Sequence, residues 1–265
     1  MDPLKKIRSM TSDIGIYQHG KLDKPDPEFG YALEDQARAL IVADEFEDKN
    51  LKDIYLNFIF KAQREDGLLY HFYYENNGKG LFKNEEHNSK SNTKEAYGLT
   101  LWSLLSTKSN KDSFIKKIIG NLIEEASSWT SIRAISAALL GLLSLDYQHS
   151  LENELKAKLH NFYFETYSDD WVWFENYLVY ANAFIPWSLW ETYLKRKCKT
   201  SFEIAKKTTD FLINNFQENN IPLIDENFAC YDALNPEGVN LNQGAESNIC
   251  FLLAFLAAKR LGIIK

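Results

Sequence analysis

The stretch WVWFENYLVYANAFIPWSLW, residues 171–190, is the most informative part of this sequence. The spacing of its apolar residues predicts a largely apolar helix from Glu175 to about Tyr193. Polar side chains nevertheless occur near its start, and burying such groups without partners costs about 1–3 kcal/mol each. We therefore expect the N-terminal end of this helix to open into a cavity. A core helix whose polar groups are satisfied internally is the alternative.

The residue types at the start of this stretch suit a sugar. Trp171 and Trp173 offer flat faces that stack on the C–H surfaces of a pyranose ring, and Glu175 beside them is a potential acid. Tyr180 and Asn182 add hydrogen-bonding groups to the same stretch. The pattern thus favours a carbohydrate site.

Composition limits the functions that the chain can have. Of 265 residues, 45% are hydrophobic and 25% are charged, which is typical of a globular protein, and we expect one domain over residues 1–265. A net charge of −7 disfavours binding to nucleic acid. Three cysteines without a CxxC pair predict reduced thiols. With neither a signal peptide nor a run of about 18 apolar residues, we expect a cytoplasmic protein without a membrane span.

Apolar and amphipathic helices alternate along the chain. Mostly apolar helices are predicted at 32–46, 93–105, 130–145, 175–193 and 243–261, and amphipathic ones at 51–65, 111–126, 151–167 and 201–218. Residues 1–30 are expected to form an irregular entry segment and residues 66–92 a long aromatic loop. No pair of β-strands is predicted. The alternation indicates a repeat of helical hairpins.

A helix that is apolar all round must be covered all round, whereas an amphipathic helix covers one side only. A ring with apolar helices inside and amphipathic helices outside satisfies both conditions; an α-solenoid is the alternative. We therefore predict an all-α fold, an (α/α) toroid of about five to six hairpins. In such a ring the inner N-termini share one end. Their polar residues, which are Glu34, Asp35, Glu95, Arg133, Glu175, Asn176, Gln243 and Glu246, would meet there as an acidic pocket.

The motifs resemble those of bacterial six-hairpin glycosidase-like proteins with an (α/α) toroid, often encoded beside or fused to glycosyltransferases. The resembling segments follow in the same order from about Ser9 to the C-terminus. They are Gly15–His19 (GIYQH), Pro25–Leu40 (PDPEFGYALEDQARAL), Thr93–Glu95 with Gly98 and Trp102, Ser131–Ala134 (SIRA), Trp171–Ala183, Tyr231–Leu234 (YDAL) and Asn240–Ser247 (NLNQGAES).

The resemblance implies the toroid, a carbohydrate ligand such as an oligosaccharide, and a glycosyltransferase as a possible partner. This chain departs from the family pattern at Glu34 and Gln36, where Asp and Asn are usual, and at Lys94, where an acid is lost. It also lacks the length of one hairpin. A five-hairpin ring, an open ring, or completion by a second copy in a homodimer are the resulting possibilities.

Hydrolysis of a glycoside needs two carboxyl groups, one as an acid and one as a base or nucleophile. We assign Glu175 as the acid, because the adjacent tryptophans would desolvate it, and Asp35 as the base, oriented by Arg38. Glu246 is the reserve for either role, and similarity to toroidal glycosidases favours inversion. Helix starts and resembling motifs together give the expected substrate-binding residues: Gln18, His19, Tyr31, Glu34, Arg38, Glu95, Arg133, Trp171, Trp173, Tyr180, Asn182, Asp232, Asn242 and Gln243.

Two other functions were weighed. A non-catalytic glycan-binding module, accessory to a glycosyltransferase, would use the same aromatic and amide groups, and the lost acid at Lys94 favours it somewhat. A toroidal prenyl enzyme is disfavoured because no DDxxD motif is present. The five histidines lack metal-binding spacing, and no phosphate-binding or dinucleotide motif occurs, so neither a metal nor a cofactor is expected.

Overall fold

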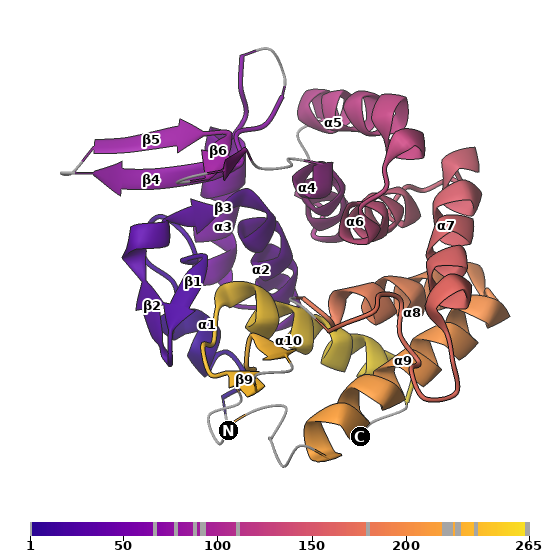
Figure 1. The fold of residues 1–265 in the computed structure, drawn as a ribbon. Coiled ribbons are helices and arrows are strands. Elements are labelled where there is room, and N and C mark those ends of the chain that lie inside the picture. The colour runs from indigo at the N-terminus through magenta and orange to yellow at the C-terminus, as the bar shows by residue number, and fades with distance from the viewer. Residues whose placement is uncertain are drawn as a thin grey trace.

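The computed structural model describes residues 2–65, 68–76, 79–86, 89–90, 94–109, 112–178, 181–218, 225, 229–235 and 238–262. These residues are mostly helical (Figure 1). The larger helices are α2 (Leu33–Glu45), α3 (Lys49–Lys61), α4 (Lys94–Ser106), α5 (Asp112–Glu125), α6 (Ile132–Leu143), α7 (Ser150–Thr166), α8 (Phe184–Arg196), α9 (Lys199–Glu218) and α10 (Ala245–Arg260). All nine helices expected from the sequence are present, and the all-α class is confirmed.

The even-numbered helices form the inner ring of a toroid. Helix α2 packs on α4, α4 on α6, α6 on α8, and α8 on α10, and α10 returns to pack on α2. The odd-numbered helices α3, α5, α7 and α9 each pack on the inner helix that precedes them (Figure 1). The ring is therefore closed within one chain, by five inner helices among the described residues.

The inner helices are apolar because neighbouring helices cover them, as the alternation of helix types implied. Every residue of α6 is buried, including Arg133. Helices α4 and α6 approach most closely at Gly98 and Gly141, where a side chain on Gly98 would place its Cβ 2.3 Å from the carbonyl carbon of Ala137. Two glycines at one crossing let the backbones meet, as small residues do wherever helices pack tightly.

The expected absence of strand pairs was wrong. Within the segment expected to be a loop, strand β4 (Phe72–Asn76) pairs antiparallel with β5 (Lys79–Lys83). Strand β3 (Tyr31–Ala32), directly before α2, pairs antiparallel with β4. The rings of Tyr73 and Phe82 pack on Phe58 of α3, so α3 anchors the hairpin. Further two-stranded sheets are β6 (Glu85–Glu86) with β7 (Ser89–Lys90), and β8 (Ala233–Asn235) with β9 (Gly238–Asn240).

The entry segment is also more ordered than expected. It contains α1 (Lys5–Ser9), which packs on α10, and strands β1 (His19–Lys21) and β2 (Lys24–Asp26), which form a hairpin. A 3₁₀ turn, η1 (Pro27–Phe29), precedes β3, and another, η2 (Ala126–Ser128), follows α5. Helix α1 thus covers part of α10, which has no amphipathic helix after it among the described residues.

The aromatic helix begins later than predicted. Helix α8 starts at Phe184, so Glu175 and Asn176 lie on the irregular segment before it rather than in its first turn. Side chains satisfy the backbone of this segment, because Trp171 Nε1 donates to the Glu175 carbonyl at 2.6 Å and Thr166 Oγ1 donates to the Trp173 carbonyl at 2.7 Å. These bonds compete with helical hydrogen bonds and hold the segment against α7.

Across the described residues, no helix combines the length and apolar character needed to cross a lipid bilayer.

Candidate active site

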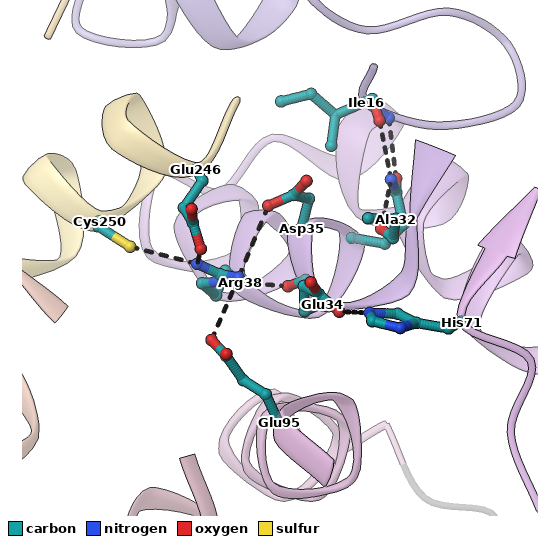
Figure 2. Close-up of polar contacts among 10 residues, drawn as sticks. Ile16, Ala32, Glu34, Asp35, Arg38, His71, Glu95, Glu246 and Cys250 are labelled. Carbon is teal, nitrogen blue, oxygen red and sulfur yellow. Dashed lines mark hydrogen bonds and ion pairs between the residues drawn. The ribbon is translucent and has the colours of Figure 1, made fainter. Parts of the chain in front are cut away.

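Arg38 of α2 lies at the centre of an acidic cluster (Figure 2). Its side chain is completely buried. The guanidinium Nη1 lies 2.7 Å from Glu246 Oε1 of α10, and Nη2 lies 3.5 Å from Glu95 Oε1 of α4 and 3.7 Å from Asp35 Oδ1 of α2. One buried cation therefore faces three carboxyl groups from three inner helices.

Other groups complete the surroundings of Arg38. Its Nε donates to the Glu34 carbonyl at 3.3 Å, Nη1 contacts Cys250 Sγ at 3.4 Å, and the guanidinium lies 5.5 Å from the ring centroid of Phe184. Phe184 is the first residue of α8. The starts of α2, α4, α8 and α10 therefore converge on one point, as the alternation of helices predicted.

Burial controls the protonation of two of these acids. Desolvation raises the pKa of Asp35 well above its usual value, although Arg38 opposes the shift. Desolvation likewise raises the pKa of Glu95 to about 8, against the lowering effect of Arg38 and with the help of Glu34 and Glu246. Three ionised carboxyl groups beside one cation repel one another, and the pKa of about 8 favours the protonated form of Glu95 at neutral pH.

The three acids that face Arg38, together with Glu34, differ in how far their side chains are exposed to solvent. The Asp35 side chain is 3% exposed, whereas the side chains of Glu95, Glu34 and Glu246 are 16%, 17% and 25% exposed. Glu95 and Glu246 therefore combine contact with Arg38 and access to solvent. Asp35 is an internal member of the cluster.

Glu34 makes a contact that the sequence did not predict. Its carboxylate pairs with Nε2 of His71, a buried residue directly before β4. The backbone joins the same elements, since Leu33 N donates to the His71 carbonyl at 2.8 Å. The hairpin that was expected to be a loop thus supplies a wall beside the start of α2.

A second arginine pair lies at the start of α6. Arg133 Nη1 and Nη2 each lie 3.1 Å from one carboxylate oxygen of Glu175, in a bidentate arrangement. Ser131 caps α6 by accepting a hydrogen bond from Ala134 N at 3.3 Å. Arg133 is close enough to Glu95 to lower its pKa, so the Arg133–Glu175 pair borders the Arg38 cluster. The unusual cation at a helix start is therefore explained by Glu175.

The residues around the start of α10 join the entry segment to the ring. Asp232 Oδ1 accepts from Gly244 N at 2.7 Å and from Ser247 Oγ at 2.8 Å, and burial raises the pKa of this carboxyl. Asn242 Oδ1 accepts from Leu22 N at 2.9 Å. Gln243 Nε2 also donates to Asp225 Oδ2 at 2.9 Å, and Ala245 N donates to the Gln18 carbonyl at 3.2 Å.

The aromatic residues expected at the pocket are mostly internal. Tyr31 is buried and stacks on Tyr17, with ring centroids 4.7 Å apart, and Trp173 is buried against Phe211. Trp171 is half-buried. His19 is partly exposed and packs edge-on against Phe29, whereas Asn182 is buried. Tyr180 lies outside the described residues. Stacking faces for a sugar are therefore fewer than the sequence suggested.

Gln36 of α2 makes a buried contact with the entry segment. Its side chain is buried, accepts from Ile16 N and donates to the Ile16 carbonyl, both at 2.8 Å. This amide therefore fixes the GIYQH segment beside α2.

Sequence reasoning missed two further partners of Arg38, Cys250 and Phe184. Both lie on apolar helix faces, where no neighbouring polar residue marks them as contacts of a charged group.

Within the part of the chain that the structure describes, no group of three or more His, Cys, Asp or Glu side chains is arranged to hold a metal ion.

No protein-family model matches the sequence, and no curated protein sequence matches it. Solved structures do match, among them one titled "Crystal structure of unsaturated glucuronyl hydrolase specific for heparin". That match has a TM-score of 0.34 and 11% sequence identity, and covers 98% of this chain and 66% of the other. The toroid is therefore assigned from the helix packing of this chain itself.

Proposed function

We propose that this protein is a carbohydrate-active hydrolase that cleaves an oligosaccharide by paired-carboxyl acid–base catalysis. The observation that carries the proposal is the convergence of Glu95 and Glu246 on the buried Arg38, with the two acids in different electrostatic surroundings. Glycoside hydrolysis requires one protonated and one ionised carboxyl group, and environments that separate two such groups are typical of these sites.

Glu95 is our proposed general acid. Its pKa of about 8 keeps it protonated at neutral pH, and its partial exposure lets it reach a leaving-group oxygen. The sequence had favoured Glu175 for this role. Glu175 instead accepts two hydrogen bonds from Arg133, one on each carboxylate oxygen, and this bidentate contact holds it at the start of α6. We therefore propose that Glu175 and Arg133 bind substrate hydroxyl groups at the rim.

Glu246 is our proposed base. It is the most exposed acid of the Arg38 cluster, and its Oε1 accepts a hydrogen bond from Arg38 Nη1 at 2.7 Å. Asp35, the base favoured from sequence, is almost inaccessible and has a raised pKa, so we propose that it positions Arg38 instead. With a water molecule activated by Glu246, the reaction inverts the anomeric configuration.

The test is a panel of oligosaccharides, neutral and uronic acid-containing, incubated with the purified protein and examined by mass spectrometry for cleavage. Proton NMR of the first product formed then reports its anomeric configuration. Cleavage with inversion supports the proposal. Retention contradicts the base role of Glu246, and binding without any cleavage contradicts hydrolysis.

A second candidate is glycan binding without turnover, in an accessory module of a glycosyltransferase. The internal position of Asp35, Arg38 and Trp173 favours it, because these residues stabilise the fold whether or not catalysis occurs. In this case the partly exposed carboxyl groups of Glu95 and Glu246 only accept sugar hydroxyl bonds. Calorimetry that detects binding of an uncleaved oligosaccharide would favour this function over hydrolysis.

A further inference from the structure

A hollow lies between helices α8, α9 and α10. Its volume is about 240 Å³. Its α10 wall is one helix face, with Ser247, Phe251, Ala254, Phe255 and Ala258 at helical spacing. We call this hollow the α9–α10 groove. The oligosaccharide binding proposed above does not require an apolar surface of this kind.

The groove is apolar along its length. Trp190 of α8 forms part of its lining, and Leu212 and Ile213 of α9 face α10 across it. Phe251 and Phe255 remain partly exposed on the α10 side. From Ser247 to Ala258 the α10 wall extends for about 16 Å at 1.5 Å per residue. An elongated apolar group of that length matches the groove.

Polar groups border one end of the groove, and that end adjoins the acidic cluster. Asn182, Asp232 and Ser247 line it. Ser247 directly follows Glu246, the proposed base, at the start of α10. Cys250 lines the groove, and its Sγ lies 3.4 Å from Arg38 Nη1. A ligand in the groove would therefore place its polar end beside the proposed site.

We infer that the substrate is an amphipathic glycoside, whose sugar occupies the acidic cluster and whose apolar aglycone lies along α10 in the α9–α10 groove. This inference rests on the proposed function for the sugar end and on the groove itself for the aglycone. The Lys206–Asp210 ion pair of α9, with its atoms 2.6 Å apart, also lines this hollow of about 240 Å³. The aglycone is thus an alkyl or similarly narrow chain of limited length.

The experiment measures binding of n-alkyl β-D-glucopyranosides from methyl to dodecyl, below their micelle concentrations, by isothermal titration calorimetry. An n-alkanol series provides the sugar-free comparison. Burial of one methylene group corresponds to about a fourfold gain in affinity, from about 0.8 kcal/mol. We expect a gain approaching that size for each added methylene, levelling off once the chain exceeds the groove.

Two variants of α10 make the test specific. Ala254→Trp fills the groove and should abolish the chain-length gain while leaving the affinity for the methyl glycoside unchanged. Lys259→Trp places the same ring on an exposed position outside the groove and should preserve the gain. An affinity independent of chain length in the wild type, or a gain that survives in Ala254→Trp, would overturn the inference. So would a gain with alkanols but none with glycosides.

The outcomes separate the two proposals. Hydrolysis of glycosides without any dependence on chain length contradicts the groove inference alone. A chain-length gain in glycoside binding without hydrolysis of any member contradicts the proposed hydrolysis alone, and the groove then serves a glycan-binding module.

Discussion

Arg38 Nη1 and Glu246 Oε1 lie 2.7 Å apart although 208 positions separate them in the sequence. The pair joins α2, the first inner helix, to α10, the last, at the point where the ring closes. Because the guanidinium is fully buried, this contact links the stability of the fold to the charges of the proposed site.

Replacing Arg38 with Met should destabilise the protein by about 3–5 kcal/mol, because three carboxyl groups would lose their shared cation. Urea unfolding followed by circular dichroism gives the change. Arg8→Met is the matched control: Arg8 pairs with Asp48 at 2.8 Å but is 46% exposed, so its loss should cost at most about 1 kcal/mol. Equal losses in the two variants would contradict a central role for Arg38.

The raised pKa of Glu95 predicts a particular pH dependence of stability. Its pKa rises from 4.5 to about 8 on folding, so the folded state binds more protons than the unfolded state between these values. Stability should therefore fall as pH increases from about 4.5 to 8 and change little from this group above that range. Asp35, whose pKa is also raised, acts in the same direction.

Glu95→Gln should remove most of this dependence and raise the free energy of unfolding at pH 8 by about 2–4 kcal/mol relative to wild type. Unfolding in urea at several pH values provides the measurement. Lys206→Met, at an exposed ion pair, should leave the slope intact. A Glu95→Gln variant with the wild-type pH profile would show that Glu95 ionises normally.

Gly98 and Gly141 predict a steric limit at the α4–α6 crossing. Gly98→Ala should destabilise the protein by about 1–3 kcal/mol, because the added Cβ meets the backbone of α6. Gly120→Ala in α5 is the control, since no atom lies within 4 Å of its added Cβ. Helix propensity should make that change stabilising by about 0.5–1 kcal/mol. Thermal unfolding of both variants is the measurement, and a Gly98→Ala variant as stable as wild type would contradict the close crossing.

The Arg133–Glu175 pair predicts local order in the segment before α8. In Arg133→Met, amide hydrogen exchange over residues 171–178 should become faster, while exchange in α4 and α6 stays slow. Arg196→Met, which loses a different arginine–glutamate pair with Glu152, is the comparison. Unchanged exchange at 171–178 would mean that the side-chain hydrogen bonds from Trp171 and Thr166 to the backbone of this segment are sufficient to order it.

The alternation of helices was enough to predict the ring, because a fully apolar helix has few ways to be covered. The convergence of Glu95 and Glu246 followed from that ring. The start of α8 was not predictable in the same way, since side-chain bonds to the Trp173 and Glu175 carbonyls replace helical bonds there. The β4–β5 hairpin was missed because its anchor, Phe58, lies in another element.

Contacts made by uncharged or distant residues could not be predicted from the sequence either. Nothing in an apolar helix start marks Phe184 as the ring beneath Arg38, and nothing in the YHFYY segment marks His71 as the partner of Glu34. The same limit applies to Asp35. Its spacing from Arg38 was visible, but its burial depends on the rest of the ring.

The most direct test of the account compares wild type with Glu95→Gln on an oligosaccharide that the protein cleaves. Calorimetry gives the affinity, and quenched-flow or steady-state assays give the turnover. Removal of the acid should lower turnover by at least about 10²-fold while affinity changes little. Turnover that is unchanged in Glu95→Gln would contradict the account, because the protonated carboxyl beside Arg38 would then play no part in the chemistry.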